Sequence, residues 1–359
     1  MRSFTLGRIA GIKILMHWTF LLLLAWIIFS EIGKGSDTQT IILTVAFVLS
    51  IFVCVVLHEL GHSLTAKKYG IETRKITLLP IGGLATLERM PDDPKQELWI
   101  AIAGPAVNVV IAILLSFFIS FDRFQDPENI PTAITGDNFL VFLFSVNIIL
   151  VVFNAIPAFP MDGGRILRAL LALRMDRVKA TKIASSLGQF FAFAFVIIGL
   201  FYNFFLIFIG IFVYFGAYAE NTIVQHLDLM KGFSVRDAMM TKLILLSPHE
   251  TVKDATGKLL AGSDQDFVVS ENGTVEGILT RENLISALQE KKHDYPVKEI
   301  METSFLAFDP EEKLADVYSK SQRSKTFFSP VIENDRLIGA INKENLNEFV
   351  MIRSALRLD

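Results

Sequence analysis

Long apolar runs alternate with short polar segments from the N-terminus of the chain to about Glu220. A helix that crosses a bilayer needs about 20 predominantly apolar residues, and most of the runs are close to that length. The final run is too long for one crossing, and Tyr202-Asn203 offers a tight turn inside it. The pattern predicts a polytopic α-helical membrane protein with six transmembrane helices, at 14–30, 41–57, 98–121, 138–156 and, as a pair, within 183–218.

Basic residues gather after every second run. Lys and Arg precede the first run and follow the second and fourth, whereas the loops 31–40 and 122–137 are acid-rich. Because cytoplasmic loops carry the excess of Lys and Arg, both termini are expected in the cytoplasm of a multi-pass plasma-membrane protein. The first run lacks a small-residue cleavage site, so we expect a retained anchor rather than a cleaved signal.

Composition excludes several classes of protein. The chain has 359 residues, of which 52% are hydrophobic, and a net charge of -3, which gives no basis for a nucleic-acid partner. Its single cysteine, Cys54, excludes an internal disulfide framework and a cysteine-rich structural zinc site.

A candidate metal motif, His58-Glu59-Leu60-Gly61-His62, continues the second apolar run. Residues i and i+4 share a helix face, so both imidazoles can bind one zinc ion, with Glu59 beside them as a general base. Ionisable residues at membrane depth are costly and mark functional sites by default. The motif predicts a hydrolytic metalloenzyme that works within the bilayer.

A catalytic zinc needs a third protein ligand and an open position for water. The fourth apolar run also ends at the inner side, and it leads to Asp162, whose depth matches that of the histidines. Two alternatives stay open. Asp162 could instead cap the helix that follows Gly163-Gly164, and His17 could be a ligand or a residue of the membrane boundary. The other histidines fall outside the membrane portion, at His226, His249 and His293.

The segment 76–87 is apolar but too short to span, and Pro80 and Gly82-Gly83 interrupt it. It is expected to form a re-entrant loop or a short hairpin, with a plain surface loop as the alternative. An exposed strand edge there could pair with an extended substrate segment.

These motifs carry a resemblance to a known family. HELGH on a membrane helix, followed further along the chain by Asn154-x-x-Pro157-x-x-Pro160-x-Asp162-Gly163, resembles the site-2 proteases, which are M50-type intramembrane zinc metalloproteases. The segments 80–85 and 103–108 are also similar to stretches of that family. The resemblance implies one zinc held by His58, His62 and Asp162, Glu59 as catalytic base, and Asn154 as a residue that positions or polarises the reacting groups. It also implies a single-pass regulatory protein as substrate. The plasma membrane in which we expect the chain is that of a prokaryotic cell.

The remainder of the chain is mixed in polarity and repeats itself at one fixed offset. Residues 237–239 match 299–301, and 277–284 match 339–346. A fixed period indicates duplicated supersecondary units, and each copy resembles a cystathionine-β-synthase (CBS) module. The predicted domains are a protease at 1–220, a linker at 221–232, and modules at 233–290 and 295–352.

Such a cytoplasmic α/β pair usually senses adenine nucleotides. Here Asn283 and Asn345 stand where the modules customarily carry a ribose-binding Asp, so nucleotide binding is expected to be weak or absent. A homodimer formed through the modules is the alternative role. Two other functions remain open at this stage, a CBS-gated transporter or channel and an inactive membrane scaffold. The transporter or channel has no use for the HExxH motif, and a cleavage assay would separate the scaffold from a protease.

Overall fold

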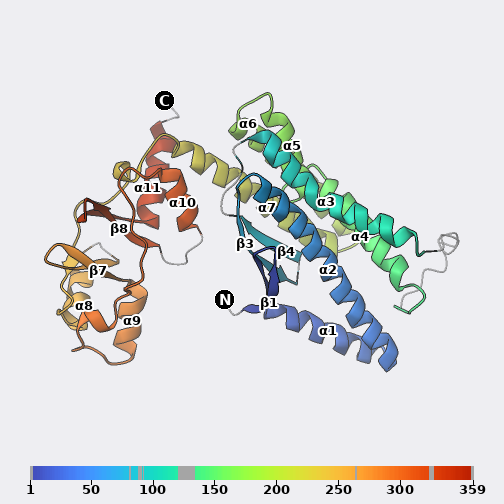
Figure 1. Cartoon of the computed structure of the whole chain (residues 1–359), viewed down its shortest axis with the longest axis horizontal. Coiled ribbons are helices and arrows are strands. Elements are labelled where there is room, and N and C mark those ends of the chain that lie inside the picture. Colours follow the sequence, from blue (N-terminus) through green and yellow to red (C-terminus); the bar gives the residue numbers. More distant parts are fainter. Residues whose placement is uncertain are drawn as a thin grey trace. The chain divides into compact units, whose positions relative to one another are not determined.

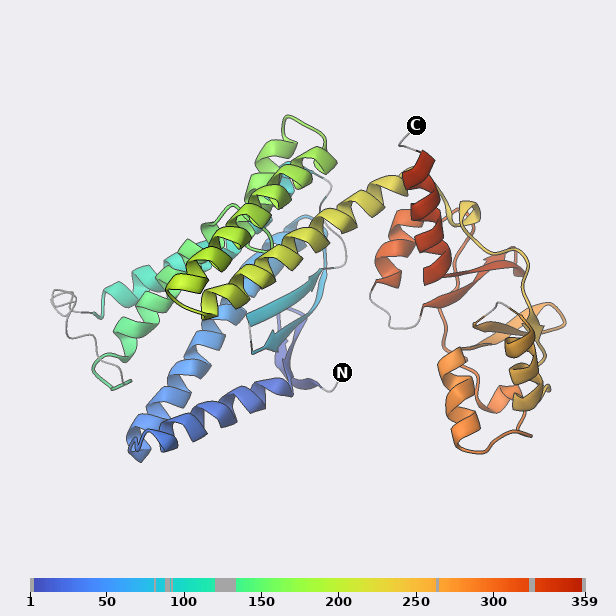
Figure 2. The same cartoon turned by 180° about the vertical axis from the view of Figure 1, so that it is seen from behind.

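The computed structural model describes residues 3–80, 82–87, 91, 93–119, 134–262, 265–322 and 327–356. The chain divides into two compact units, Met1–Thr222 and Ile223–Asp359. Figures 1 and 2 show the helices and strands of each unit.

Unit 1 is built mainly from apolar helices. Four helices of the described residues are long and apolar enough to cross a membrane, namely α2 (Thr38–Lys68), α3 (Pro94–Ser116), α6 (Arg177–Phe201) and α7 (Phe205–Leu229). Two shorter apolar helices are α1 (Thr19–Gly33) and α4 (Phe139–Ala155). The helix α5 (Asp162–Ala172) is short and amphipathic. The six predicted spans thus correspond to six apolar helices, of which four have full crossing length.

The first predicted span was wrong at its start. Residue Ile14 lies in the strand β2 (Ile12–His17), and the helix α1 begins only at Thr19. Ile12 and Ile14 are buried while Lys13 between them is exposed, which is the period-two pattern of a strand. The apolar run that follows hides this short alternation.

The other predicted boundaries fall close to those observed. The break between α6 and α7 lies at Tyr202-Asn203, as predicted. The helix α7 continues to Leu229, so most of the expected linker at 221–232 is helical. The third span ends as a helix at Ser116, and its predicted end at Phe121 and most of the loop 122–137 lie outside the described residues.

A four-stranded sheet lies in the angle between α1 and α2 (Figures 1 and 2), with strand order β1-β2-β3-β4. β1 (Ser3–Ile9) and β2 form an antiparallel hairpin, β2 and β3 (Thr73–Leu79) run parallel, and β3 and β4 (Gly82–Leu87) are antiparallel. The segment 76–87 is therefore a hairpin, one of the two predicted forms. Buried side chains of this sheet pack on the helices, Ile76 on Leu60 of α2 and Leu78 beside Phe20 and Phe52.

Helix α3 is central to unit 1, since it packs against α2, α4 and α5. Its backbone approaches α2 closely, because a Cβ atom on Gly61 would lie 2.7 Å from the carbonyl oxygen of Ala103. Glycine thus lets the helix that carries the histidines settle directly on α3.

Unit 2 contains the predicted duplication. Helices α8 (Val252–Ala261) and α9 (Arg281–Gln289) have counterparts in the second copy, α10 (Leu314–Ser321) and α11 (Lys343–Leu356). The strands are β5 (Leu245–Leu246), β6 (Phe267–Glu271), β7 (Thr274–Leu279), β8 (Phe328–Glu333) and β9 (Arg336–Asn342). Each copy has its own buried apolar cluster, one around Val269 and Leu284 and the other around Val331 and Leu346.

Candidate metal centre

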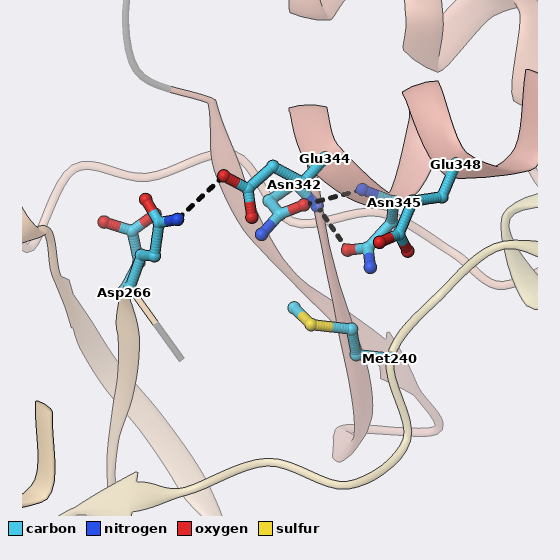
Figure 3. Close-up of a pocket in the computed structure, with 7 residues that line it drawn as sticks. Met240, Asp266, Asn342, Glu344, Asn345 and Glu348 are labelled. Atoms are coloured by element: carbon cyan, nitrogen blue, oxygen red, sulfur yellow. Dashed lines mark hydrogen bonds between the residues drawn. The ribbon is translucent and has the colours of Figure 1, made fainter. Parts of the chain in front are cut away.

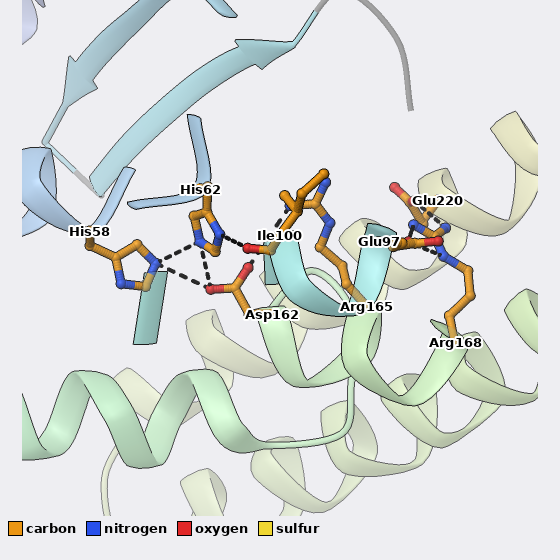
Figure 4. Close-up of polar contacts among 8 residues, drawn as sticks. All are labelled: His58, His62, Glu97, Ile100, Asp162, Arg165, Arg168 and Glu220. Carbon is orange, nitrogen blue, oxygen red and sulfur yellow. Dashed lines mark hydrogen bonds and ion pairs between the residues drawn. The ribbon is translucent and has the colours of Figure 1, made fainter. Parts of the chain in front are cut away.

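The two histidines of α2 meet the first residue of α5 (Figure 4). The Nε2 atoms of His58 and His62 each lie 3.1 Å from Oδ2 of Asp162, and 3.1 Å from one another. All three side chains are buried. The fold thus brings together residues that are about 100 positions apart in the chain.

The hydrogen bonds of His62 fix which ring nitrogen carries the proton. Its Nδ1 atom lies 2.6 Å from the carbonyl oxygen of Ile100. A carbonyl oxygen only accepts, so Nδ1 is the protonated atom and Nε2 presents its lone pair to Asp162.

A chain of amides fixes His58 in the same way. Asn147 Nδ2 donates to the carbonyl oxygen of Leu143 at 2.8 Å, which leaves Oδ1 of Asn147 to accept from Nδ2 of Asn108, also at 2.8 Å. Oδ1 of Asn108 then accepts the proton on Nδ1 of His58 at 2.5 Å. Because the Leu143 carbonyl can only accept, the direction of every bond follows from it. Three helices thereby hold His58 with its Nε2 lone pair free.

These three ligand atoms fit a zinc ion. Two imidazole nitrogens and one carboxylate oxygen converge, and in the neutral tautomer both nitrogens offer a lone pair that a bound cation would accept. Atoms placed tetrahedrally around zinc at 2.0–2.1 Å are separated by about 3.3 Å, close to the 3.1 Å found here. The ligand atoms form a group able to hold a metal ion, and three protein ligands leave a fourth position for water.

The cluster also requires a small residue on α3. A Cβ atom on Gly104 would lie 2.1 Å from Nε2 of His62 and 2.7 Å from Nε2 of His58. Only glycine leaves the space in which the lone pairs converge.

Asp162 does not have the capping role left open by the sequence. The N-cap residue of α5 is Met161, and Asp162 is the first residue of the helix itself. Its Oδ2 atom faces the histidines, while Oδ1 lies 3.9 Å from Nη1 of Arg165. The next residue, Gly163, lies so close to the Ile156 carbonyl that a Cβ atom there would be 2.2 Å from its oxygen.

Glu59 lies beside the edge strand of the sheet. A Cβ atom on Gly83 of β4 would be 2.8 Å from Cγ and 3.3 Å from Oε1 of Glu59. The backbone of β4, an edge strand among the described residues, therefore passes directly over the candidate base.

Two further sequence-based candidates, Asn154 and His17, hydrogen-bond to residues outside the cluster. The Asn154 amide donates to the carbonyl oxygen of Leu150 within its own helix, at 2.9 Å. Nδ1 of His17 lies 2.7 Å from Oγ1 of Thr19, which fits a residue at the boundary of α1. Conversely, sequence reasoning gave no role to Asn108 or Asn147. Both are amides in apolar helices, and that costly placement is the signal that could have pointed to them.

Comparison with known proteins identifies the family of the chain. A model described as Peptidase family M50 matches residues 46–197, and a CBS domain model matches 235–290 and 297–351. A zinc metalloprotease of Methanocaldococcus jannaschii is 36% identical over 345 residues, covering 96% of this chain and 95% of its own. The chain belongs to peptidase family M50, the site-2 proteases.

Other members cover less of the chain. Stage IV sporulation protein FB of Bacillus subtilis is 28% identical over 136 residues, 38% of this chain and 43% of its own. The solved structure of a site-2 protease from M. jannaschii is 43% identical and covers 61% of this chain and 95% of its own, with a TM-score of 0.45. The predicted class, a zinc metalloprotease with a tandem CBS pair, is confirmed, and the transporter reading is set aside.

A pocket in unit 2 is lined by three carboxylates (Figure 3). Its lining consists of Met240, Gln265, Asp266, Asn342, Glu344, Asn345 and Glu348. Asn345 is engaged within the chain, since it exchanges hydrogen bonds with Asn342 at 3.2 and 2.9 Å at the start of α11. In the other module, Nδ2 of Asn283 donates to Oε1 of Glu302 at 3.0 Å. Both Asn residues are thus already hydrogen-bonded.

Proposed function

We propose that this site-2 protease hydrolyses a peptide bond within or next to the transmembrane segment of a membrane-anchored regulatory protein. The observation that carries the proposal is the convergence of three buried ligand atoms, from His58, His62 and Asp162, beside Glu59 on an apolar helix. We place both termini in the cytoplasm and count six crossings, an assignment supported by the distribution of Lys and Arg.

Each residue of the proposed site has its own role in hydrolysis. A zinc ion on the three ligands would lower the pKa of a bound water to about 7 and polarise the scissile carbonyl. Glu59 accepts the proton of the attacking water and passes it to the leaving amine. Asn108 and the Ile100 carbonyl hold the two imidazoles in the tautomer that presents Nε2.

The substrate enters in extended form. A helical segment hides its carbonyls in its own hydrogen bonds, so it must unwind before cleavage. The edge strand β4 offers unpaired backbone groups to such a segment, and Gly83 places that edge next to Glu59. Pairing with β4 would therefore deliver an unwound peptide to the base.

The CBS pair adjusts activity, and we assign it a dimer-forming role with weak nucleotide binding. The acidic lining of its pocket supports the weak nucleotide binding, because Asp266, Glu344 and Glu348 repel phosphate groups. A ligand or partner acts on cleavage only if it binds two states of the pair differently.

The proposal is tested by comparing the wild-type protein with Glu59→Gln. The variant removes the base and leaves all three ligands, so it should retain zinc while cleavage falls at least about 100-fold, the lower range for loss of a general base. In cells that carry the variant, the uncut membrane substrate should accumulate and be identified by mass spectrometry. Substantial cleavage by purified Glu59→Gln protein would contradict the mechanism.

A further inference from the structure

A buried arginine, Arg168 on α5, takes no part in the chemistry described above. It is 0% exposed. Its Nε and Nη2 atoms donate to Oε1 of Glu97 at 2.8 and 2.5 Å, and Nη1 donates to Oε1 of Glu220 at 2.5 Å (Figure 4). A charge removed from water is tolerated only when it is paired and hydrogen-bonded. Arg168 thus ties α5 to α3 and α7.

The link to α3 falls at a specific place. Glu97 is 3% exposed and lies one helical turn before Ile100, whose carbonyl oxygen accepts from His62. The second oxygen of Glu97 lies 3.4 Å from Nη2 of Arg177, so both carboxylate oxygens are occupied. The ion pair therefore fastens the helix of Asp162 to the turn of α3 that orients His62.

Arg168 also contacts the segment that precedes Asp162. Its Cζ atom lies 4.9 Å from the ring centroid of Phe159, in the turn between α4 and α5. That ring is 1% exposed. The backbone is tight here, since a Cβ atom on Gly164 would be 2.5 Å from the amide nitrogen of Phe159. Arg168 follows Asp162 in α5, and its guanidinium contacts Phe159, which precedes Asp162. The side chain therefore links the segments before and after the proposed ligand.

We infer that Arg168 is a positioning residue that sets the place of the Asp162 carboxylate relative to the two histidines. The inference rests on the proposed function, in which Asp162 is the third zinc ligand. Groups that orient metal ligands typically change metal affinity by about 10- to 100-fold when they are replaced. Lysine keeps the charge but has a single nitrogen, so it cannot reproduce the contacts of the planar fork with both carboxylates.

The test measures zinc release from the purified full-length chain to an excess of chelator, at a temperature where each variant remains folded. Arg168→Lys should release zinc at least about tenfold faster than wild type. Its kcat should fall with little change in KM, because substrate contacts are untouched. The matched control is Arg174→Gln, an exposed arginine just after α5, which should behave as wild type.

A second variant keeps the inference testable if Arg168→Lys fails to fold. Glu97→Gln retains the size of the side chain and leaves Arg168 paired with Glu220. Like Arg168→Lys, it should release zinc faster than wild type. The inference is overturned if Arg168→Lys and Glu97→Gln lower the melting temperature but release zinc as slowly as Arg174→Gln does. Arg168 would then be a stabilising residue only. Zinc release is measured without substrate. A wild-type chain that binds zinc but cleaves no substrate would therefore contradict the proposed protease function and leave the positioning role of Arg168 unaffected.

Discussion

The imidazole of His58 donates through Nδ1 to Oδ1 of Asn108 at 2.5 Å, and the bond joins α2 to α3. Asn147 of α4 extends it by one further amide. Nε2 of His58, the proposed zinc ligand, is therefore oriented by groups on two other helices.

Asn108→Ala should weaken zinc binding about 10- to 100-fold, because the ring of His58 loses the partner that fixes its tautomer. Asn154→Ala is the informative comparison, since that amide bonds only within its own helix in the contacts described here. It should retain zinc as wild type does. Competitive titration with a fluorescent zinc chelator measures both variants, and equal affinities for Asn108→Ala and wild type would contradict the relay of amides.

The same pair of variants tests the catalytic role that the family resemblance implies for Asn154. If that role holds, Asn154→Ala lowers kcat while zinc stays bound. Wild-type kcat and wild-type zinc content in Asn154→Ala would show that Asn154 has no catalytic role.

Asp162→Asn separates a ligand from a structural residue. Loss of a carboxylate in the first turn of α5 removes a favourable interaction with the helix dipole worth about 0.3–1 kcal/mol. Loss of a ligand should reduce zinc affinity by well over tenfold, because a neutral amide oxygen is a poor substitute for a carboxylate. Zinc content by elemental analysis and melting temperature, measured on one preparation, distinguish the two. Full zinc content with a small drop in melting temperature would reopen the search for the third ligand.

The sequence was sufficient to predict the parts of the site that depend on local spacing. The i, i+4 histidines, the break at Tyr202-Asn203 and the duplication of the CBS module are local or periodic features, and these are legible without a structure. The proximity of Asp162 to the histidines was predictable from the direction of the fourth apolar run, because two runs that end on the same side bring the residues that follow them to similar depth. The strand β2 was missed because its short alternation of buried and exposed residues merges into an apolar run.

Contacts between helices could not be predicted from the sequence. The bonds from His58 to Asn108 and from Arg168 to Glu97 join residues that are far apart in the chain. Their formation depends on which faces of three helices meet. Apolar helices in a bilayer show little amphipathic pattern, so the sequence does not reveal which face is buried against protein.

Gly104→Ala should abolish zinc binding although alanine favours the helix. The added methyl group would lie 2.1 Å from Nε2 of His62, in the space where the ligand atoms converge. Alanine is about 1 kcal/mol better than glycine inside a helix, so a loss of zinc cannot be assigned to a weaker α3. Gly33→Ala is the control, because a Cβ atom there meets nothing within 4 Å. Zinc binding by Gly104→Ala at wild-type affinity would show that the three ligand atoms do not share one metal.

The CBS pair should bind adenosine at least as well as ATP, ADP or AMP, reversing the usual preference for phosphates. Three carboxylates face the pocket, and a phosphate placed among them meets like charge. Burial raises the pKa of the Asp266 carboxyl, so protonation as the pH falls should remove one repulsive charge and improve nucleotide binding at lower pH. Glu348→Gln, which removes another charge at neutral pH, should raise AMP affinity. Calorimetry on the purified full-length chain checks all three. Tight ATP binding by the wild-type chain would refute the prediction. It would indicate instead that the ATP concentration regulates the protease.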